Sequence, residues 1–476
     1  MNWNGLKAER VFYWFEQLCA IPHGSGNTKA ISDFCVSFAQ ENGLEWEQDA
    51  WNNVIITKSA TFGYESEPAI ILQGHLDMVC VKEPDKEIDF ETDGISLLLD
   101  GDFLTAEGTS LGADNGIAVA ICMAILESDS LEHPRIEAVF TTDEETGMDG
   151  AANIDLSYLQ GSQLINIDSE QEGVFTVGCA GGIQVNWFLD IFRQKETGTY
   201  GKIEISGLSG GHSGIEIGKE SANAIVLLGK LLHDLGSAIS VISVTGGEKS
   251  NAIPVFACVE FLTMDFEMVK TIVTKKEQEW KLSFGLTDPE LLVTVTEEEL
   301  LETDCFTTDC AKKLSMLLYH YPCGVQSRET SLDGMVRTSL NLGVLTTNEN
   351  EISGVFCARS SLESEKRDLV NHLISLTEYL GGRVETEGAF PAWEMRHHSP
   401  LRDKLSAIYQ AQYGREPVIE VIHAGLECGM FSEKIADLDC VSIGPDLFDI
   451  HTPAERISIS SVGRLWDFIL EVLKRK

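Results

Sequence analysis

The sequence predicts an α/β fold: a discontinuous catalytic domain with a mostly parallel sheet, plus an inserted α+β lid domain with two related halves. Short apolar runs typical of buried strands alternate with helical patterns such as the alanine-rich segment 117–126; these runs are residues 69–72, 136–140 and 164–167. Strands that alternate with helices are typical of a parallel sheet covered on both faces. This alternation stops near residue 184 and returns after about residue 391, which predicts an insertion.

The middle of the chain carries a faint internal repeat. Val244–Cys258 resembles Val344–Ala358 at an offset of 100 residues. A hairpin repeated in this way predicts two related halves, although two copies are too few for a solenoid. We therefore expect residues 1–186 and 390–476 to form the discontinuous domain and residues 187–389 to form the inserted lid domain.

The charge balance excludes several classes of partner. Lys and Arg total 35 against 75 Asp and Glu, so the net charge is −40. Such a surface repels phosphate backbones and anionic lipids, so we expect no nucleic-acid and no membrane partner. No basic leader precedes an apolar segment, and no apolar run approaches the roughly 18 residues of a membrane span. The 12 cysteines form no CxxC pair, which is typical of reduced thiols in a cytoplasmic protein.

Five polar clusters follow predicted strands or begin helices. Each contains acids or a histidine; they are Gly74–Asp77, Gly112–Gly116, Thr141–Gly147, Asp168–Glu170 and Asp449–Pro453. Because the carboxyl ends of parallel strands meet in one crevice, we expect these side chains to converge. A single such cluster is more often a solvated acidic run or a turn, but five together predict a metal site. Two divalent ions would offset the repulsion between the carboxylates, and zinc, cobalt or manganese suit these ligands.

The ordered set of motifs resembles the di-zinc aminoacylase/carboxypeptidase family of metallopeptidases. The motifs are GHLD (74–77), GADN (112–115), TTDEETGMDGA (141–151), NIDSE (166–170) and DIHTPAE (449–455). The sequences SNAIP (250–254) and HAGLECG (423–429), with the long doubled insertion, are most similar to its cytosolic aminoacyl-histidine dipeptidase branch. The resemblance extends over essentially the whole chain.

This resemblance implies a pair of metal ions, with zinc as the first expectation. It makes His75 a ligand of one ion, with Asp168 completing that shell. It makes Glu145 and His451 ligands of the other ion, and Asp114 the carboxylate that bridges both. Asn115 departs from the Asp found in many members, at a position that is not a ligand in the family.

The resemblance also implies the catalytic groups. Asp77 would orient the imidazole of a metal ligand, and Glu144 would act as general base and then acid toward a metal-bridged water. His212 would hold the substrate carbonyl oxygen, in dimeric members from the partner subunit. The alternative for His212 is an ordinary glycine-rich turn. Ser213 is not expected to be a nucleophile, because Gly211–Ile215 lacks the final glycine of G-x-S-x-G.

Three residues are expected to bind the ends of the substrate. Asn251 and Arg359 resemble lid residues of the family that grip the free carboxylate, although Arg359 could instead be a surface arginine. Glu427 could receive the α-ammonium group, because a dipeptidase needs an anion there.

The sequence thus predicts metal-dependent hydrolysis of unblocked dipeptides, including aminoacyl-histidine (Xaa-His) dipeptides. An N-acyl amino-acid deacylase or a tripeptidase of the same fold remains an alternative, and so does a non-catalytic scaffold that binds metal or peptide. A two-metal phosphatase or nuclease is disfavoured because no basic phosphate clamp flanks the motifs. From the resemblance we expect a homodimer formed through the lid domain.

Overall fold

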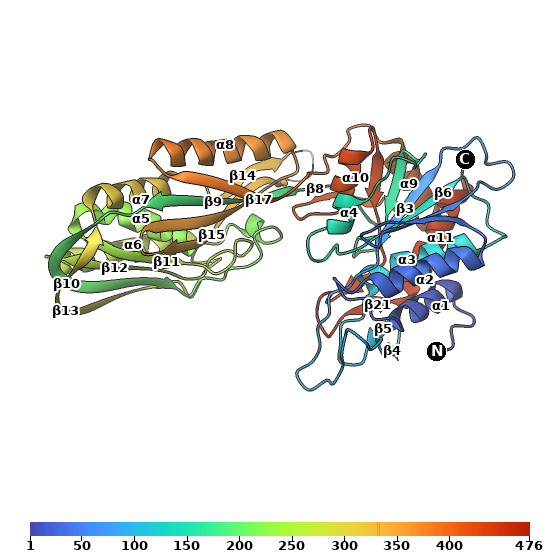
Figure 1. Ribbon diagram of the computed structural model, residues 1–476, viewed down its shortest axis with the longest axis horizontal. Coiled ribbons are helices and arrows are strands. Elements are labelled where there is room, and N and C mark those ends of the chain that lie inside the picture. The colour runs from blue at the N-terminus through green and yellow to red at the C-terminus, as the bar shows by residue number, and fades with distance from the viewer. Residues whose placement is uncertain (331, 333) are drawn as a thin grey trace. The chain divides into compact units, whose positions relative to one another are not determined.

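The computed structural model describes residues 1–330, 332 and 334–476, which fold into two compact units (Figure 1). The first unit comprises residues 1–178, 395–420 and 426–476, and the second comprises residues 179–394 and 421–425. A discontinuous first unit interrupted by an insertion is the architecture that the sequence predicts. The expected boundaries, 186/187 and 389/390, fall inside strands β9 and β17, which both belong to the second unit.

The first unit is built on an eight-stranded sheet. Its strands, in spatial order, are β1 (Glu45–Gln48), β2 (Val54–Lys58), β6 (Ile136–Thr141), β3 (Ile70–His75), β7 (Gln163–Asn166), β19 (Asp439–Ser442), β8 (Val174–Cys179) and β18 (Val418–Ile422). The four central strands, β6, β3, β7 and β19, are parallel, and every residue of β3 and β6 is buried. Strands β1, β2 and β8 pair antiparallel at the two sides, so the sheet is parallel at its centre and mixed at its edges.

Seven helices accompany this sheet in the described part of the first unit. They are α1 (Glu9–Cys19), α2 (Lys29–Glu41), α3 (Ala113–Glu127), α4 (Asp149–Asn153), α9 (Pro400–Tyr413), α10 (Cys428–Lys434) and α11 (Ile459–Lys474). Helix α3 contacts both α1 and β3, and its residues from Ile117 to Leu126 are all buried. A helix that is apolar all round belongs in a core, which explains its alanine-rich sequence.

A small four-stranded sheet lies within the same unit. Its order is β20 (Leu447–Phe448), β21 (Arg456–Ser458), β5 (Phe103–Ala106) and β4 (Leu97–Asp100). The connection between β20 and β21 is the segment 449–455, which carries His451. Pairing of β21 with β5 therefore anchors the far end of this segment to residues that precede α3.

The second unit contains a nine-stranded antiparallel sheet. Its main path runs β13 (Leu292–Phe306), β10 (Arg193–Ser206), β12 (Ala257–Thr263), β11 (Ser240–Gly246), β15 (Met335–Thr347), β16 (Glu351–Ser360), β9 (Gly181–Asp190) and β17 (Arg383–Phe390), with β14 (Gly324–Glu329) paired to β15. Helices α5 (Ala224–Leu235), α6 (Phe266–Phe284), α7 (Thr308–His320) and α8 (Glu363–Tyr379) share one hydrophobic core with this sheet.

The two halves of the second unit have the same strand order. In the first half β10, β11, β12 and β13 lie in the order β13-β10-β12-β11, and in the second half β9, β15, β16 and β17 lie in the order β17-β9-β16-β15. Each half thus has the order fourth-first-third-second along its own strands. The segments of the sequence repeat contain the connections of the antiparallel pairs β11–β12 and β15–β16, with the strand ends that adjoin them. A common origin of the two halves stays a prediction, and the shared order favours it.

Among the described residues, no helix combines the length and the apolar character that a membrane crossing requires.

Candidate metal centre

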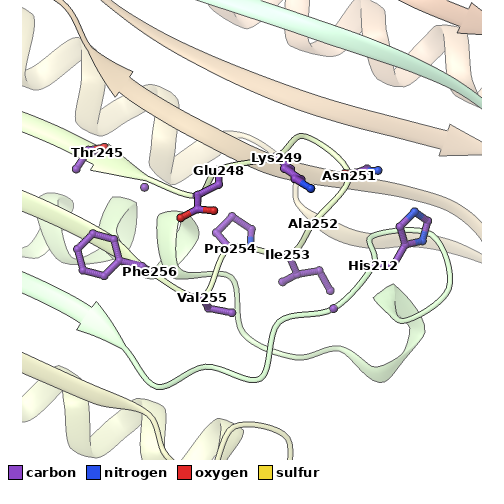
Figure 2. A pocket seen from close by; sticks show the side chains of 13 residues that line it. His212, Thr245, Glu248, Lys249, Asn251, Ala252, Ile253, Pro254, Val255 and Phe256 are labelled. Atoms are coloured by element: carbon purple, nitrogen blue, oxygen red, sulfur yellow. The ribbon is translucent and has the colours of Figure 1, made fainter. Parts of the chain in front are cut away.

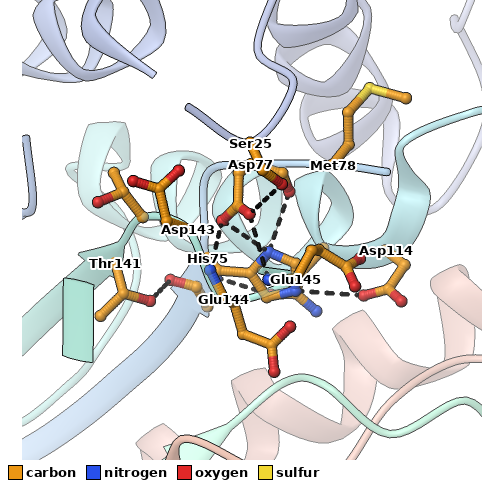
Figure 3. Close-up of polar contacts among 12 residues, drawn as sticks. Ser25, His75, Asp77, Met78, Asp114, Thr141, Asp143, Glu144 and Glu145 are labelled. Atoms are coloured by element: carbon orange, nitrogen blue, oxygen red, sulfur yellow. Dashed lines mark hydrogen bonds and ion pairs between the residues drawn. The ribbon is translucent and has the colours of Figure 1, made fainter. Parts of the chain in front are cut away.

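His75 is the last residue of β3, and its imidazole is buried among carboxylates (Figure 3). Its Nε2 atom lies 3.3 Å from Oδ1 of Asp114 and 3.6 Å from Oδ1 of Asp168. Its Nδ1 atom lies 3.0 Å from the backbone carbonyl of Asp77 and 3.5 Å from the Asp77 carboxylate. Contact of Nδ1 with Asp77 fixes the ring so that Nε2 faces the carboxylate cluster.

The Asp77 carboxylate connects this imidazole to the acidic pair that follows β6. It accepts hydrogen bonds from Oγ of Ser25 (2.8 Å) and from the backbone N–H groups of Glu144 (3.1 Å) and Glu145 (3.3 Å). One buried carboxylate therefore orients His75 and also positions the segment that carries both glutamates.

The Asp114 carboxylate lies between two imidazoles. Its Oδ1 faces His75, whereas its Oδ2 lies 3.3 Å from Nε2 of His451. The same His451 nitrogen lies 2.9 Å from Oε1 of Glu145. The two oxygens of one carboxylate thus face two separate sets of donors, which is the arrangement of a bridging ligand.

The donor set fits a pair of divalent ions. Donor atoms within 4.8 Å of one another occur in three groups among the described residues: His75, Asp114 and Asp168; His75, Glu144 and Glu145; Asp114, Glu145 and His451. Imidazole nitrogens with carboxylate oxygens suit zinc, cobalt or manganese better than calcium or copper(I). The five side chains expected as ligands are therefore brought together from positions far apart in the sequence.

The carboxylates of this cluster create a negative potential that stabilises positive charge on the two histidines. Burial alone would lower the pKa of His75, but the carboxylates of Asp114, Asp168 and Asp77 raise it well above its usual value. Asp114 and Glu145 raise the pKa of His451 to about 10. Without an added cation, the carboxylates thus recruit protons onto both imidazoles. A divalent ion at each position would take the place of those protons.

Two acids near the cluster have raised pKa values. Burial raises the pKa of Asp168 to about 6, and the neighbouring carboxylates Asp114 and Glu145 add to this effect. Burial also raises the pKa of Glu144 well above its usual value, together with the negative charge of Asp168 and Glu427 and against the opposing effect of His75. The Glu144 carboxylate therefore holds a proton more readily than a solvated glutamate does.

Glu427 lies immediately before α10 and is completely buried. Its Oε2 accepts hydrogen bonds from Nε2 of Gln73 (2.5 Å) and from Oγ1 of Thr141 (2.7 Å). Its Oε1 has no hydrogen-bond partner among the described residues. Burial raises the pKa of Glu427 to about 7.

The three remaining candidates lie in the second unit. His212 and Asn251 line a cavity of about 660 Å³ with the segment Thr245–Phe256 (Figure 2). Nδ1 of His212 accepts hydrogen bonds from the backbone N–H groups of Gly214 and Ile215, both 3.3 Å long. Burial, followed by the positive charge of Arg359, lowers the pKa of His212. The imidazole is therefore neutral, with its proton on Nε2.

Arg359 is a buried arginine, which the sequence left open as a surface residue. It is 9% exposed, and its guanidinium lies 5.9 Å from the centre of the Phe390 ring. Its Nε has no hydrogen-bond partner within the described part of the chain. A buried cation in this state is suited to an incoming anion.

Two buried polar residues contact the ligand segments and were not among the predicted site residues. Asn115 donates from Nδ2 to Oδ1 of Asp168 (2.7 Å) and accepts at Oδ1 from the backbone N–H of His75 (3.1 Å). Glu455, four residues after His451, contacts the backbone that leads into Asp114. Both residues end motifs named above, GADN and DIHTPAE. The motifs do not indicate these contacts, because the partners of both side chains are backbone or acidic groups far away in the sequence.

Comparison with known proteins identifies the family. The sequence profile described as peptidase family M20/M25/M40 matches residues 71–475, which is most of the chain. The chain belongs to peptidase family M20/M25/M40.

Two relatives match this member of the family along nearly its whole length. The cytosol non-specific dipeptidase of Escherichia coli (strain K12) is 35% identical over 475 residues, covering 98% of each chain. The crystal structure of aminoacylhistidine dipeptidase from Vibrio alginolyticus matches with a TM-score of 0.94 and 34% identity, covering 100% of this chain and 98% of that one. A tripeptidase from Staphylococcus aureus shares the fold at a TM-score of 0.56 and 16% identity, with 98% of both chains covered. These matches confirm the predicted family and α/β fold class.

Proposed function

We propose that this chain is a metal-dependent dipeptidase that hydrolyses unblocked dipeptides, including Xaa-His dipeptides. The observation that carries the proposal is the position of Asp114, whose two carboxylate oxygens face His75 and His451 at 3.3 Å each. Support for the substrate class comes from the names of the two full-length relatives, a non-specific dipeptidase and an aminoacylhistidine dipeptidase.

The proposed cofactor is a pair of divalent ions, with zinc first and cobalt or manganese as alternatives. His75 and Asp168 would hold one ion, Glu145 and His451 would hold the other, and Asp114 would contact both. When bound, such a pair lowers the pKa of a water toward neutrality and polarises the carbonyl of the peptide bond.

Glu144 is the proposed general base and acid. Its backbone is fixed by Asp77, and burial among carboxylates raises its pKa. The ionised side chain would accept a proton from the attacking water and then donate it to the leaving amine. In the proposed assignment Glu144 is not a ligand of either ion, so we expect its substitution to separate catalysis from metal binding.

His212 is the proposed donor to the substrate carbonyl oxygen. Because its Nδ1 accepts two backbone N–H groups, its Nε2–H is free to donate to the negative charge that develops on that oxygen. We also propose a homodimer formed through the second unit. In such a dimer His212 could serve the site of its own chain or that of the partner subunit, and the proposal covers both arrangements. A cytoplasmic location is proposed because the Escherichia coli relative is a cytosol protein by name.

The ends of the dipeptide are assigned by charge. Arg359, with Asn251 beside His212, would bind the substrate carboxylate, because its guanidinium is buried with Nε unpartnered. Glu427 would attract the α-ammonium group through its unpartnered Oε1. Glu427 is fully buried. A direct contact with the α-ammonium group therefore requires the Glu427 side chain to change its conformation or the substrate to enter the protein interior.

The test is a substrate panel. Free dipeptides, N-acyl amino acids and tripeptides are incubated with chelator-treated protein and with the same protein restored with Zn²⁺, Co²⁺ or Mn²⁺, and amino-acid release is measured. We expect release of histidine from Xaa-His dipeptides only after metal is restored. Preference for acylated substrates would move the proposal to a deacylase, and preference for tripeptides would move it to a tripeptidase. Metal binding with no hydrolysis of any substrate would favour a scaffold.

A further inference from the structure

The carboxylate of Glu455 binds four consecutive backbone N–H groups. Oε2 accepts from Leu111 (2.7 Å) and Gly112 (3.0 Å), and Oε1 accepts from Ala113 (2.9 Å) and Asp114 (3.2 Å). These groups form the turn that opens α3, in which Gly112 adopts a φ of 73°. Gly112, the residue that precedes α3, has no side chain that could cap the helix. Glu455, more than 340 positions away in the sequence, supplies the cap instead.

The segment that carries Glu455 also carries His451. The Glu455 N–H donates to the carbonyl of Thr452 (3.2 Å), and the Glu455 carbonyl accepts from Oγ1 of Thr105 (3.0 Å). Arg456 contacts the Asp449 carboxylate at 2.9 Å. The turn 449–456 is thus internally tied and anchored to β5, so displacement of Glu455 would also displace His451.

Two contacts therefore join this turn to one residue. Glu455 accepts the backbone N–H of Asp114, and His451 faces Oδ2 of the Asp114 side chain. Glu455 is only 2% exposed, and a buried carboxylate is costly unless hydrogen bonds compensate its charge. Four N–H groups at a helix N-terminus provide that compensation. A carboxylate that binds them holds the backbone of the turn in one place.

We propose that Glu455 is a positioning residue for the metal subsite made of Asp114, Glu145 and His451. It fixes the spacing between the bridging carboxylate and the imidazole that faces it, although it touches neither ion nor substrate. This inference rests on the proposed metal dependence and adds to it the group that sets the geometry of one subsite. The other subsite, at His75 and Asp168, depends on Glu455 only through Asp114.

The test compares Glu455→Gln with a matched control, Glu137→Gln. Glu137 lies at the start of β6, in the same unit, and is also fully buried. Its carboxylate accepts the backbone N–H groups of Gln160 and Gly161 at 3.0 Å. Each substitution replaces one acceptor oxygen with an NH₂ group that faces N–H donors, so each should lower the melting temperature. Only Glu455 is joined to the metal ligands.

The measurement is titration of metal-free protein with Co²⁺, followed by visible absorption and calorimetry. We expect wild type and Glu137→Gln to bind two equivalents with the same affinities. We expect Glu455→Gln to bind the first equivalent within a few-fold of wild type and the second about 10- to 100-fold more weakly, the range found for partners of metal ligands. The absorption bands of the second ion should also shift.

Two equivalents bound with wild-type affinities and spectra by Glu455→Gln would overturn the inference and leave Glu455 as a helix cap only. If Glu455→Gln does not fold, Glu455→Asp keeps the charge but is one methylene shorter, and the same selective loss of the second equivalent is expected. Failure of the wild-type protein to bind Co²⁺ would instead contradict the proposed function.

Discussion

At the scale of single residues, the site consists of carboxylates and imidazoles whose opposite charges stabilise one another. Asp77 contacts His75 and the backbone of Glu144 and Glu145, so its removal would disturb a proposed metal ligand and the proposed general base together. For Asp114, burial alone would raise the pKa, but contacts with His451 and His75 hold the pKa well below its usual range. The carboxylates of Asp77 and Asp114 are therefore each paired with a specific histidine.

Substitution of Glu144 by Gln tests the assignment of the general base. The variant keeps the size of the side chain and the backbone contact with Asp77 but cannot accept the proton, so kcat should fall about 10²- to 10⁴-fold. Metal content, measured by elemental analysis after reconstitution, should equal that of wild type. Asp143→Asn is the neighbouring control, since Asp143 contacts the Gly26 backbone instead, and it should stay near wild-type activity. Turnover retained by metal-replete Glu144→Gln would reassign the base.

The sequence could predict which side chains gather in the candidate metal centre but not the residues that hold these side chains in place. His75, Asp168 and His451 stand in recognisable motifs after apolar strands, and strand ends in a parallel sheet converge. Asn115 stood in such a motif as well, but only as a departure from the family pattern. Its function in holding Asp168 and His75 depends on contacts 53 and 40 positions away. No local pattern encodes such contacts.

At the scale of elements, the direction of the outer strands could not be predicted. β2 is an apolar run like β3 and β6, so its composition indicates a buried strand without its direction. It pairs antiparallel with β6, whereas β3 pairs parallel. Strand β6 follows β2 in the chain only after β3, β4, β5 and α3, so no single connection between the two neighbours indicates the direction of β2. The prediction was therefore correct for the centre of the sheet and incomplete at its edges.

The end of β18 makes a contact in the second unit that should depend on pH. His423 follows β18, and its Nε2 lies 2.7 Å from Oγ of Ser339 on β15. Burial, followed by the positive charge of Arg359, lowers the pKa of His423 to about 4. Protonation thus favours the unfolded chain, in which the pKa is about 6.5. The stability contribution is present above pH 6.5 and is lost as the pH falls toward 4.

Denaturant unfolding of wild type and His423→Gln at pH 7.5 and pH 4.5 measures this effect. Wild type should lose up to about 3 kcal/mol more of its free energy of unfolding than the variant over this interval. Ser339→Ala is a useful control, because it removes the hydrogen bond and keeps the titrating imidazole. An equal loss in wild type and His423→Gln would show that His423 does not titrate in this range.

At the scale of the whole molecule, the predicted site residues are divided between the two units. The first unit contains the predicted metal ligands, Glu144 and Glu427, and the second contains His212, Asn251 and Arg359. The net charge of −40 makes binding to anionic polymers unfavourable but does not indicate a dipeptide, because charge reports on solubility and association rather than on a pocket. The substrate class comes from the site and from the relatives, and the division into units agrees with an insertion in a catalytic fold.

The most direct test of the account is the position of the metals in the intact protein. Crystals of the Zn²⁺-restored protein, measured at the zinc absorption edge, should show two anomalous peaks in the first unit. One peak should lie about 2 Å from donor atoms of His75 and Asp168, and the other about 2 Å from those of Glu145 and His451. Each should bind a different oxygen of Asp114. A single peak, or two peaks that do not share Asp114, would contradict the proposed centre.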